Sequence, residues 1–141
     1  MVPILTESVV RSRATLAVMA SRIIVVTDEV WARNEVHAAL TEPDFTLVDH
    51  DDPATAAELL EAEEADAVVV DLQVANMGGM AIARELHQQA ALKDRAEVPV
   101  VLLLDRSADS FLAKRAGVAG WVTKPFSAHE LRTAVEQAIS Q

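Results

Sequence analysis

Acidic residues follow three apolar runs of the sequence, where buried strands would end. Asp28 comes shortly after the run Ile23–Val26, and Asp71 directly follows Ala67–Val70. Asp105 follows a third run. Ligands bind beyond the carboxyl ends of the strands in open parallel sheets. Two close carboxylates repel each other unless a proton or a cation intervenes, and Mg²⁺ prefers oxygen ligands of this kind. The acids therefore predict a divalent-cation site around Asp28 and Asp71.

Five short apolar runs would position these acids. Three are nearly continuous and rich in Val, Ile and Leu, which indicates burial on both faces, as in a parallel sheet covered by helices. Strands that alternate with helical segments predict an α/β three-layer sandwich with a five-stranded parallel sheet and right-handed crossovers. The runs are Ile23–Val26, Phe45–Val48, Ala67–Val70, Val98–Leu104 and Trp121–Val122.

The helical segments carry their own start signals. Asp52 can cap a helix that has Pro53 at its first position. A third helix is expected to begin near Gly79, and Ser127 with Glu130 forms a capping box for the last one. Apolar residues then recur at helical spacing in each segment. These residues include Ala32, Val36, Ala39, Leu40, Ala56, Leu59, Leu60, Ile82, Leu86, Phe111, Leu112, Leu131, Val135 and Ile139.

A strand order of 2-1-3-4-5 would make the first and third strands neighbours at the point where the order reverses. Asp28 and Asp71 would then face each other across the crevice. The simpler interpretation is that each acid caps the next helix, because Asp is a common N-cap residue. That interpretation suits Asp28 better than Asp71, because a specific pattern follows Asp71.

Composition narrows the function classes. The chain has 141 residues, of which 51% are hydrophobic and 24% charged, and this fits one globular domain. Its net charge of -10 disfavours binding to phosphate backbones, so no nucleic-acid partner is expected. No apolar run is long enough to insert into a membrane. The absence of cysteine favours a reducing, cytoplasmic location.

The chain divides into two parts. Residues 23–141 hold the alternating strand and helix pattern and form the predicted domain. Residues 1–22 are an N-terminal extension without the continuous apolar region of a signal peptide. The extension is either an arm with an apolar stripe or the result of a start site placed too early.

Two short motifs carry a resemblance to a known family. The segment from Asp71 reads Asp-Leu-Gln-Val-Ala-Asn-Met-Gly-Gly and resembles the phosphoacceptor loop of bacterial response-regulator receiver domains. Gly117, Gly120, Trp121 and Lys124–Phe126 resemble the end of the same domain, with a glycine turn, an aromatic residue and Lys-Pro-Phe. The resemblance spans residues 23–140 and implies the flavodoxin-like receiver fold.

The resemblance implies a role for each matching residue. Asp71 would accept a phosphoryl group from a histidine kinase or a small phosphodonor. Asp28, Asp71 and the backbone carbonyl of Gln73 would bind Mg²⁺, which offsets charge on the phosphoryl oxygens. Lys124 would pair with the acylphosphate, and the Lys124–Pro125 bond would be cis, as X-Pro bonds allow. The simpler alternative is that Lys124 is an ordinary surface lysine.

The sequence departs from the family at the parts that sense phosphorylation. Thr27 stands where the family has a first acid, so we expect a weakened Mg²⁺ site. Leu104 stands at the switch position where the family has a hydroxyl residue, and a shift by one would place Asp105 there. Trp121 occupies the aromatic switch position, although it could equally be packing at an edge strand.

These observations support two functions. The first is a stand-alone receiver domain that accepts a phosphoryl group on Asp71 and signals through a protein–protein contact. The alternative is a degenerate receiver that acts without phosphorylation, as an adaptor or accessory subunit of a larger enzyme assembly. An enzyme is not expected: Gln73 replaces the second Asp of haloacid-dehalogenase phosphatases, and no glycine-rich phosphate loop follows the first strand. The helix-turn-helix of a DNA-binding regulator is also missing.

Overall fold

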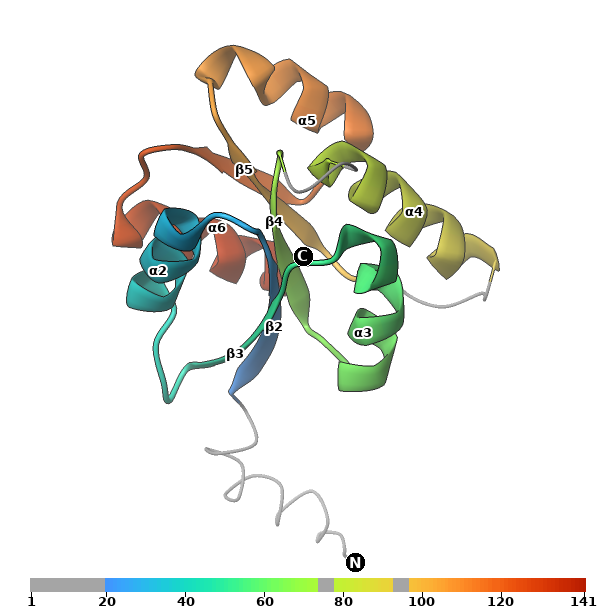
Figure 1. Ribbon diagram of the computed structural model, residues 1–141, viewed down its shortest axis with the longest axis horizontal. Helices are drawn as coiled ribbons and strands as arrows, with labels where there is room; N and C mark the ends of the chain where they lie inside the picture. Colours follow the sequence, from blue (N-terminus) through green and yellow to red (C-terminus); the bar gives the residue numbers. More distant parts are fainter. Residues whose placement is uncertain (1–19, 74–77, 93–96) are drawn as a thin grey trace, which may run out of the picture.

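A parallel sheet of five strands forms the centre of the molecule (Figure 1). The structure is a computed structural model that describes residues 20–73, 78–92 and 97–141. The strand order is β3-β2-β4-β5-β6, which confirms the predicted order 2-1-3-4-5. The strands are β2 (Ser21–Val26), β3 (Phe45–His50), β4 (Ala67–Asp71), β5 (Val100–Leu104) and β6 (Gly120–Thr123).

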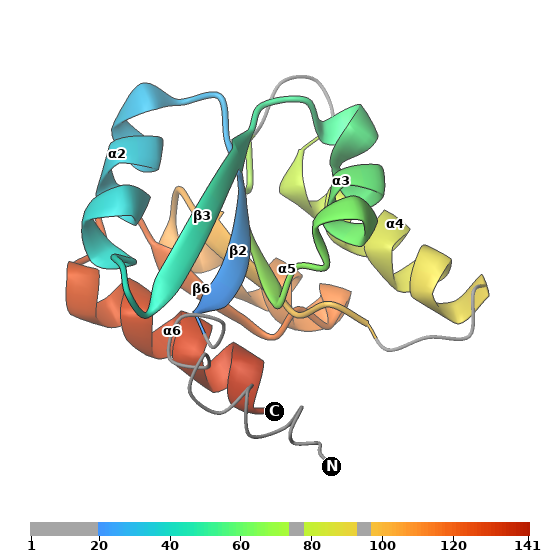
Figure 2. The same cartoon turned by 90° about the horizontal axis from the view of Figure 1, so that it is seen from below.

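Helices cover both faces of this sheet, as the continuous apolar strands predict. Helices α2 and α6 lie on one face, and α3, α4 and α5 lie on the other (Figures 1 and 2). The helices are α2 (Val30–Ala39), α3 (Ala56–Glu63), α4 (Gly79–Leu92), α5 (Ser110–Ala116) and α6 (Ala128–Ser140), with short 3-10 turns at Pro53–Thr55 and Ser107–Asp109.

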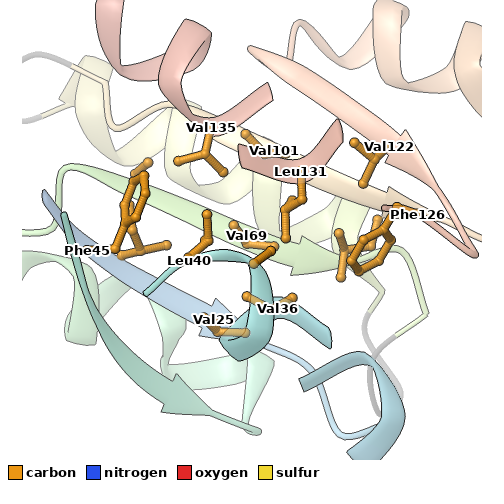
Figure 3. Close-up of a cluster of buried hydrophobic side chains, with 14 of the residues drawn as sticks. Val25, Val36, Leu40, Phe45, Val69, Val101, Val122, Phe126, Leu131 and Val135 are labelled. Carbon is orange, nitrogen blue, oxygen red and sulfur yellow. The ribbon is translucent and has the colours of Figure 1, made fainter. Parts of the chain in front are cut away.

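Alternate residues of each strand contribute to two separate hydrophobic cores. In β4, Ala67 and Val69 face α2 and α6, whereas Val68 and Val70 face the other helices. All four side chains are fully buried. Figure 3 shows the first core, where side chains from the strands meet those of α2 and α6. Its labelled residues are Val25, Val36, Leu40, Phe45, Val69, Val101, Val122, Phe126, Leu131 and Val135.

Local signals explain where the helices begin. Helix α6 has the predicted capping box: the Ser127 hydroxyl accepts from the Glu130 amide at 3.0 Å, and the Glu130 carboxylate accepts from the Ser127 amide at 2.8 Å. Asp52 accepts a bond from the Ala54 amide, but Pro53 opens a 3-10 turn instead of the α-helix itself. The α-helix starts three residues later than expected, at Ala56.

The N-terminal boundary is partly described. Strand β2 begins at Ser21, two residues before the apolar run that predicted it. Residues 1–19 of the predicted N-terminal extension lie outside the described residues.

Candidate functional site

Four polar residues continue one face of the sheet at the carboxyl ends of its strands. Asp71 is the last residue of β4, and Thr27, Asp105 and Lys124 each come directly after a strand. Side chains two positions apart in a strand point to the same face of the sheet. The residue two positions before each of these four belongs to the core under α2 and α6. Since parallel strands end at a common edge, these side chains converge there.

The carboxylate of Asp71 is the buried centre of this group. The side chain is 1% exposed. Its Oδ1 accepts from the Lys124 amine at 2.8 Å and from the Gln73 amide at 3.3 Å, and its Oδ2 accepts from the Thr27 hydroxyl at 2.9 Å. The Lys124 amine also lies 3.0 Å from Oδ2, so three donors, one of them cationic, fix the orientation of the carboxylate.

Lys124 is shared among three carboxylates. Besides Asp71, its amine lies 3.0 Å from the carboxylate of Glu29 and 3.2 Å from that of Asp105. The side chain of Lys124 is 13% exposed. Burial lowers the pKa of Lys124, but the hydrogen bonds to Asp71 and Glu29 and the charge of Asp71 outweigh it, so the pKa is raised above its ordinary value. The amine is therefore a permanent positive charge beside Asp71.

Thr27 takes part in the site through its hydroxyl. The residue is 1% exposed, and its hydroxyl donates to Asp71 while accepting from the Glu29 amide at 3.1 Å. The Thr27 carbonyl also accepts a bond from the Arg33 guanidinium at 3.3 Å. The buried hydroxyl of Thr27 therefore acts both as a donor and as an acceptor.

The two other predicted metal ligands lie at the rim of the site. Asp28 and Gln73 are exposed. The N-cap position of α2 is Glu29, one residue after Asp28. The Glu29 carboxylate of the same loop contacts the Lys124 amine. Among the described residues, no cluster of three His, Cys, Asp or Glu side chains could hold a metal ion.

The two predicted switch residues lie on the opposite face of the sheet. Leu104 is fully buried in the core under α3, α4 and α5, and Trp121 packs against the same core while partly exposed. Trp121 pairs with Leu102 on the neighbouring strand. The predicted cis peptide at Lys124–Pro125 is confirmed.

Glu29 is the site residue that sequence reasoning missed. It follows directly on Thr27 and Asp28, so its place in an acidic loop after the first strand was a visible signal. Nothing in the sequence distinguished Asp28 from Glu29 as the residue that contacts Lys124, because the β2–α2 turn determines which side chain points inward.

Comparison with known proteins defines the class of the chain. The model of the response regulator receiver domain family matches residues 23–136, and the chain belongs to this family. Receiver domains of this family serve two-component signalling, so the resemblance read from Asp71 and Lys124 is confirmed at the level of the family.

Solved structures show the same fold. The chemotaxis response regulator CheY4 of Vibrio cholerae superimposes with a TM-score of 0.71 at 19% identity, covering 84% of this chain and 98% of that one. A LuxR-family two-component response regulator from Aurantimonas sp. has a TM-score of 0.73 at 26% identity, with 86% of each chain covered. The receiver domain of sensor histidine kinase PA1611 from Pseudomonas aeruginosa, which has a magnesium ion coordinated in its active-site cleft, matches with a TM-score of 0.71 at 20% identity, over 86% of this chain and 99% of that one.

None of the helices in the described part of the chain combines the length and the apolar character that crossing a bilayer requires.

Proposed function

We propose that this receiver domain accepts a phosphoryl group on Asp71 and signals through contact with a protein target. The observation that carries the proposal is the buried Asp71 carboxylate at the end of the central strand, held by the Lys124 amine at 2.8 Å. A buried carboxylate with a fixed orientation and a permanent cation beside it suits in-line attack on phosphorus. Its position at the reversal of strand order is where such folds bind ligands.

The proposed transfer is a substitution at phosphorus. One carboxylate oxygen of Asp71 forms a bond to the phosphorus of the donor, and the bond from phosphorus to the leaving group breaks. A phosphohistidine of a kinase releases its imidazole nitrogen, and acetyl phosphate releases acetate, which keeps the electron pair of the broken bond. Lys124 balances the negative charge that accumulates on the phosphoryl oxygens.

The donor chemistry of the site fits Mg²⁺. Asp71 and Asp28 are hard oxygen donors, and the backbone carbonyl of Gln73 is the proposed third ligand. Mg²⁺ often binds through one or two carboxylates and keeps several waters, so this proposed set does not require a cluster of three acidic side chains. When bound, the ion supplies positive charge to the phosphoryl oxygens. Because Thr27 contributes a neutral hydroxyl, we expect weaker Mg²⁺ binding than two adjacent acids would give.

A second function is favoured by one specific observation. Leu104 is fully buried and has no hydroxyl that can form a hydrogen bond with a phosphoryl group. It lies on the face of the sheet opposite Asp71. A receiver of this kind could serve as an adaptor whose protein contacts do not depend on phosphorylation. In that case Asp71 and Lys124 would form a structural ion pair.

Intact mass measurement separates the two functions. The full chain is incubated with Mg²⁺ and acetyl phosphate, and Asp71→Asn is treated identically. We expect a mass gain of one phosphoryl group that is absent from Asp71→Asn. Asp109→Asn, a buried acid on another loop, is the matched control and keeps the gain. No gain in the unmodified chain would favour the adaptor function.

A further inference from the structure

Four residues at the site form a closed circuit of hydrogen bonds. The Glu29 amide donates to the Thr27 hydroxyl, which donates to Asp71. The Glu29 carboxylate accepts from the Lys124 amine at 3.0 Å, and the same amine donates to Asp71. Glu29 is therefore connected to Asp71 by two independent routes, one through its backbone and one through its side chain.

Within the described part of the chain, the Glu29 carboxylate contacts only Lys124. Glu29 occupies the N-cap position of α2, but its carboxylate makes no capping bond to the helix. The side chain is 49% exposed, whereas that of Asp71 is 1% exposed. The Glu29 carboxylate contacts a lysine instead of capping the helix. An exposed carboxylate can exchange such an ion pair for water at little energetic cost.

A second contact joins the first turn of α2 to the loop before α6. The ring of Trp31, two residues after Glu29, lies 5.9 Å from the ring of Phe126, two residues after Lys124. Phe126 is anchored in the core at 6% exposure, and Trp31 is 40% exposed. The beginning of α2 and the loop before α6 are thus connected by an ion pair from Glu29 and by an aromatic pair from Trp31.

We propose that Glu29 and Asp71 compete for the Lys124 amine, and that this competition couples the chemical state of Asp71 to the exposed side chain of Trp31. The coupling rests on the acceptor role of Asp71 proposed above. It describes how phosphorylation of Asp71 changes the exposure of a side chain at the surface. Glu29 is a positioning residue in this scheme, because it acts through Lys124.

Charge explains the direction of the change. A phosphoryl group on Asp71 brings additional negative charge next to Lys124, so the amine turns towards the phosphoryl oxygens. The same charge repels the carboxylates of Glu29 and Asp105, which share that amine. Once the ion pair opens, the aromatic contact of Trp31 with Phe126 is no longer supported by Glu29, and we expect Trp31 to become more exposed.

The route lies on the same face of the sheet as Asp71. Thr27, Asp71 and Lys124 continue the face covered by α2 and α6, and Phe126 belongs to that core. Leu104 and Trp121 lie on the other face, and Leu104 offers no hydroxyl. The structure therefore provides a connection to Trp31 that does not need the missing hydroxyl.

Tryptophan fluorescence tests the coupling directly, because the chain has two tryptophans. In the full chain with Trp121→Phe, emission comes from Trp31 alone. We expect Mg²⁺ and acetyl phosphate to shift this emission to longer wavelength and to increase quenching by acrylamide, in step with the mass gain. If Trp121→Phe is poorly folded, Trp121→Leu provides a second background for the same measurement.

Glu29→Gln tests the coupling without any phosphodonor. In the Trp121→Phe background, removing this charge opens the ion pair, so Trp31 should move towards the emission of the phosphorylated protein. Glu35→Gln, on the same helix and outside the contacts of Lys124, is the control and should leave the emission unchanged.

Each outcome decides one point. A mass gain without a change at Trp31 overturns the coupling and leaves the acceptor role intact. The absence of a mass gain rejects the acceptor role and with it the coupling to Asp71, and Glu29→Gln then shows only whether the ion pair with Lys124 holds Trp31 in place. An unchanged Trp31 spectrum in Glu29→Gln overturns the coupling in either case.

Discussion

Thr27 illustrates how one hydroxyl changes the electrostatics of the site. A carboxylate at this position would face Asp71 across about one hydrogen-bond length and would need a cation between them. The hydroxyl instead donates to Asp71 at 2.9 Å and accepts from the Glu29 amide. The resting site is therefore satisfied by its own groups, with Lys124 as its cation.

We predict that Thr27→Ala destabilises the fold and that Thr27→Ser does so much less. Alanine leaves a bond to a buried carboxylate and a bond from a backbone amide unmade, which costs about 1–3 kcal/mol of unfolding free energy. Serine keeps the hydroxyl and loses one methyl group. Urea unfolding of the three proteins measures the difference. Equal stability of the alanine and serine variants would show that the hydroxyl bonds contribute nothing.

The residues of the site were predictable to different degrees. Asp71 and Lys124 were identified from motif and spacing, and the structure brings them together at 2.8 Å. Continued alternation along β5 could have favoured Asp105 over Leu104 as the residue facing the site, since Leu103 lies on the same face as Asp71. The contact between Glu29 and Lys124 spans 95 residues and depends on the shape of a loop, so no local pattern encodes it.

At the scale of elements, helix α4 starts unusually close to Asp71. A Cβ atom on Gly79 would lie 2.7 Å from the Asp71 carbonyl oxygen and 3.1 Å from Leu102 Cδ2. The Gly79 amide also donates to the Leu72 carbonyl at 2.8 Å. Glycine at this position lets the first turn of α4 pack directly against the end of β4.

We predict that Gly79→Ala displaces α4 and lowers stability by about 1–3 kcal/mol, the usual range for overpacking. The nearest atom belongs to the backbone of the acceptor residue, so phosphorylation of Asp71 should also slow. Gly120→Ala is the matched control, because its Cβ would meet only ordinary contacts at 3.8 Å or more. Chemical denaturation and the acetyl phosphate assay measure the two effects. Identical behaviour of the two variants would contradict the packing argument.

The elements themselves were largely readable from the sequence. Each of the five apolar runs lies within or overlaps an observed strand, and the capping box of α6 was identified from Ser127 and Glu130. The start of α3 was less predictable. Asp52 and Pro53 signal a helix start, but a 3-10 turn and an α-helix share the same first-turn chemistry. Packing of Ala56 against the sheet then determines where the α-helix begins.

At the scale of the molecule, two cores share one sheet. In β2, β4 and β5, every residue that is buried under α2 and α6 has a neighbour in the same strand that is buried under the other helices. Removing side chains from one core therefore loosens the sheet on which the other core is built. Trp31 belongs to the side of α2, and Trp121 packs on the opposite core, so each face carries its own reporter.

We predict that Leu131→Ala lowers the unfolding free energy by about 2–5 kcal/mol, as expected for a fully buried leucine. The transitions reported by Trp31 and Trp121, each measured as the sole tryptophan, should shift together, because a small domain unfolds as one unit. Leu92→Ala, at an 85% exposed residue, is the control and should change stability by less than about 0.5 kcal/mol. A shift of the Trp31 transition alone would mean that the two faces unfold separately.

The two outermost strands have a consequence for self-association. Within the described residues β3 pairs only with β2, and β6 pairs only with β5, so each presents one free edge of backbone groups. Such edges can recruit strands from other chains and start fibrous aggregation. Here β6 has only four residues, and β3 runs into the acidic stretch of Asp49, Asp51 and Asp52. Like charges on two approaching copies repel at that edge, so the acidity of the chain also helps to keep each sheet from growing into its neighbour.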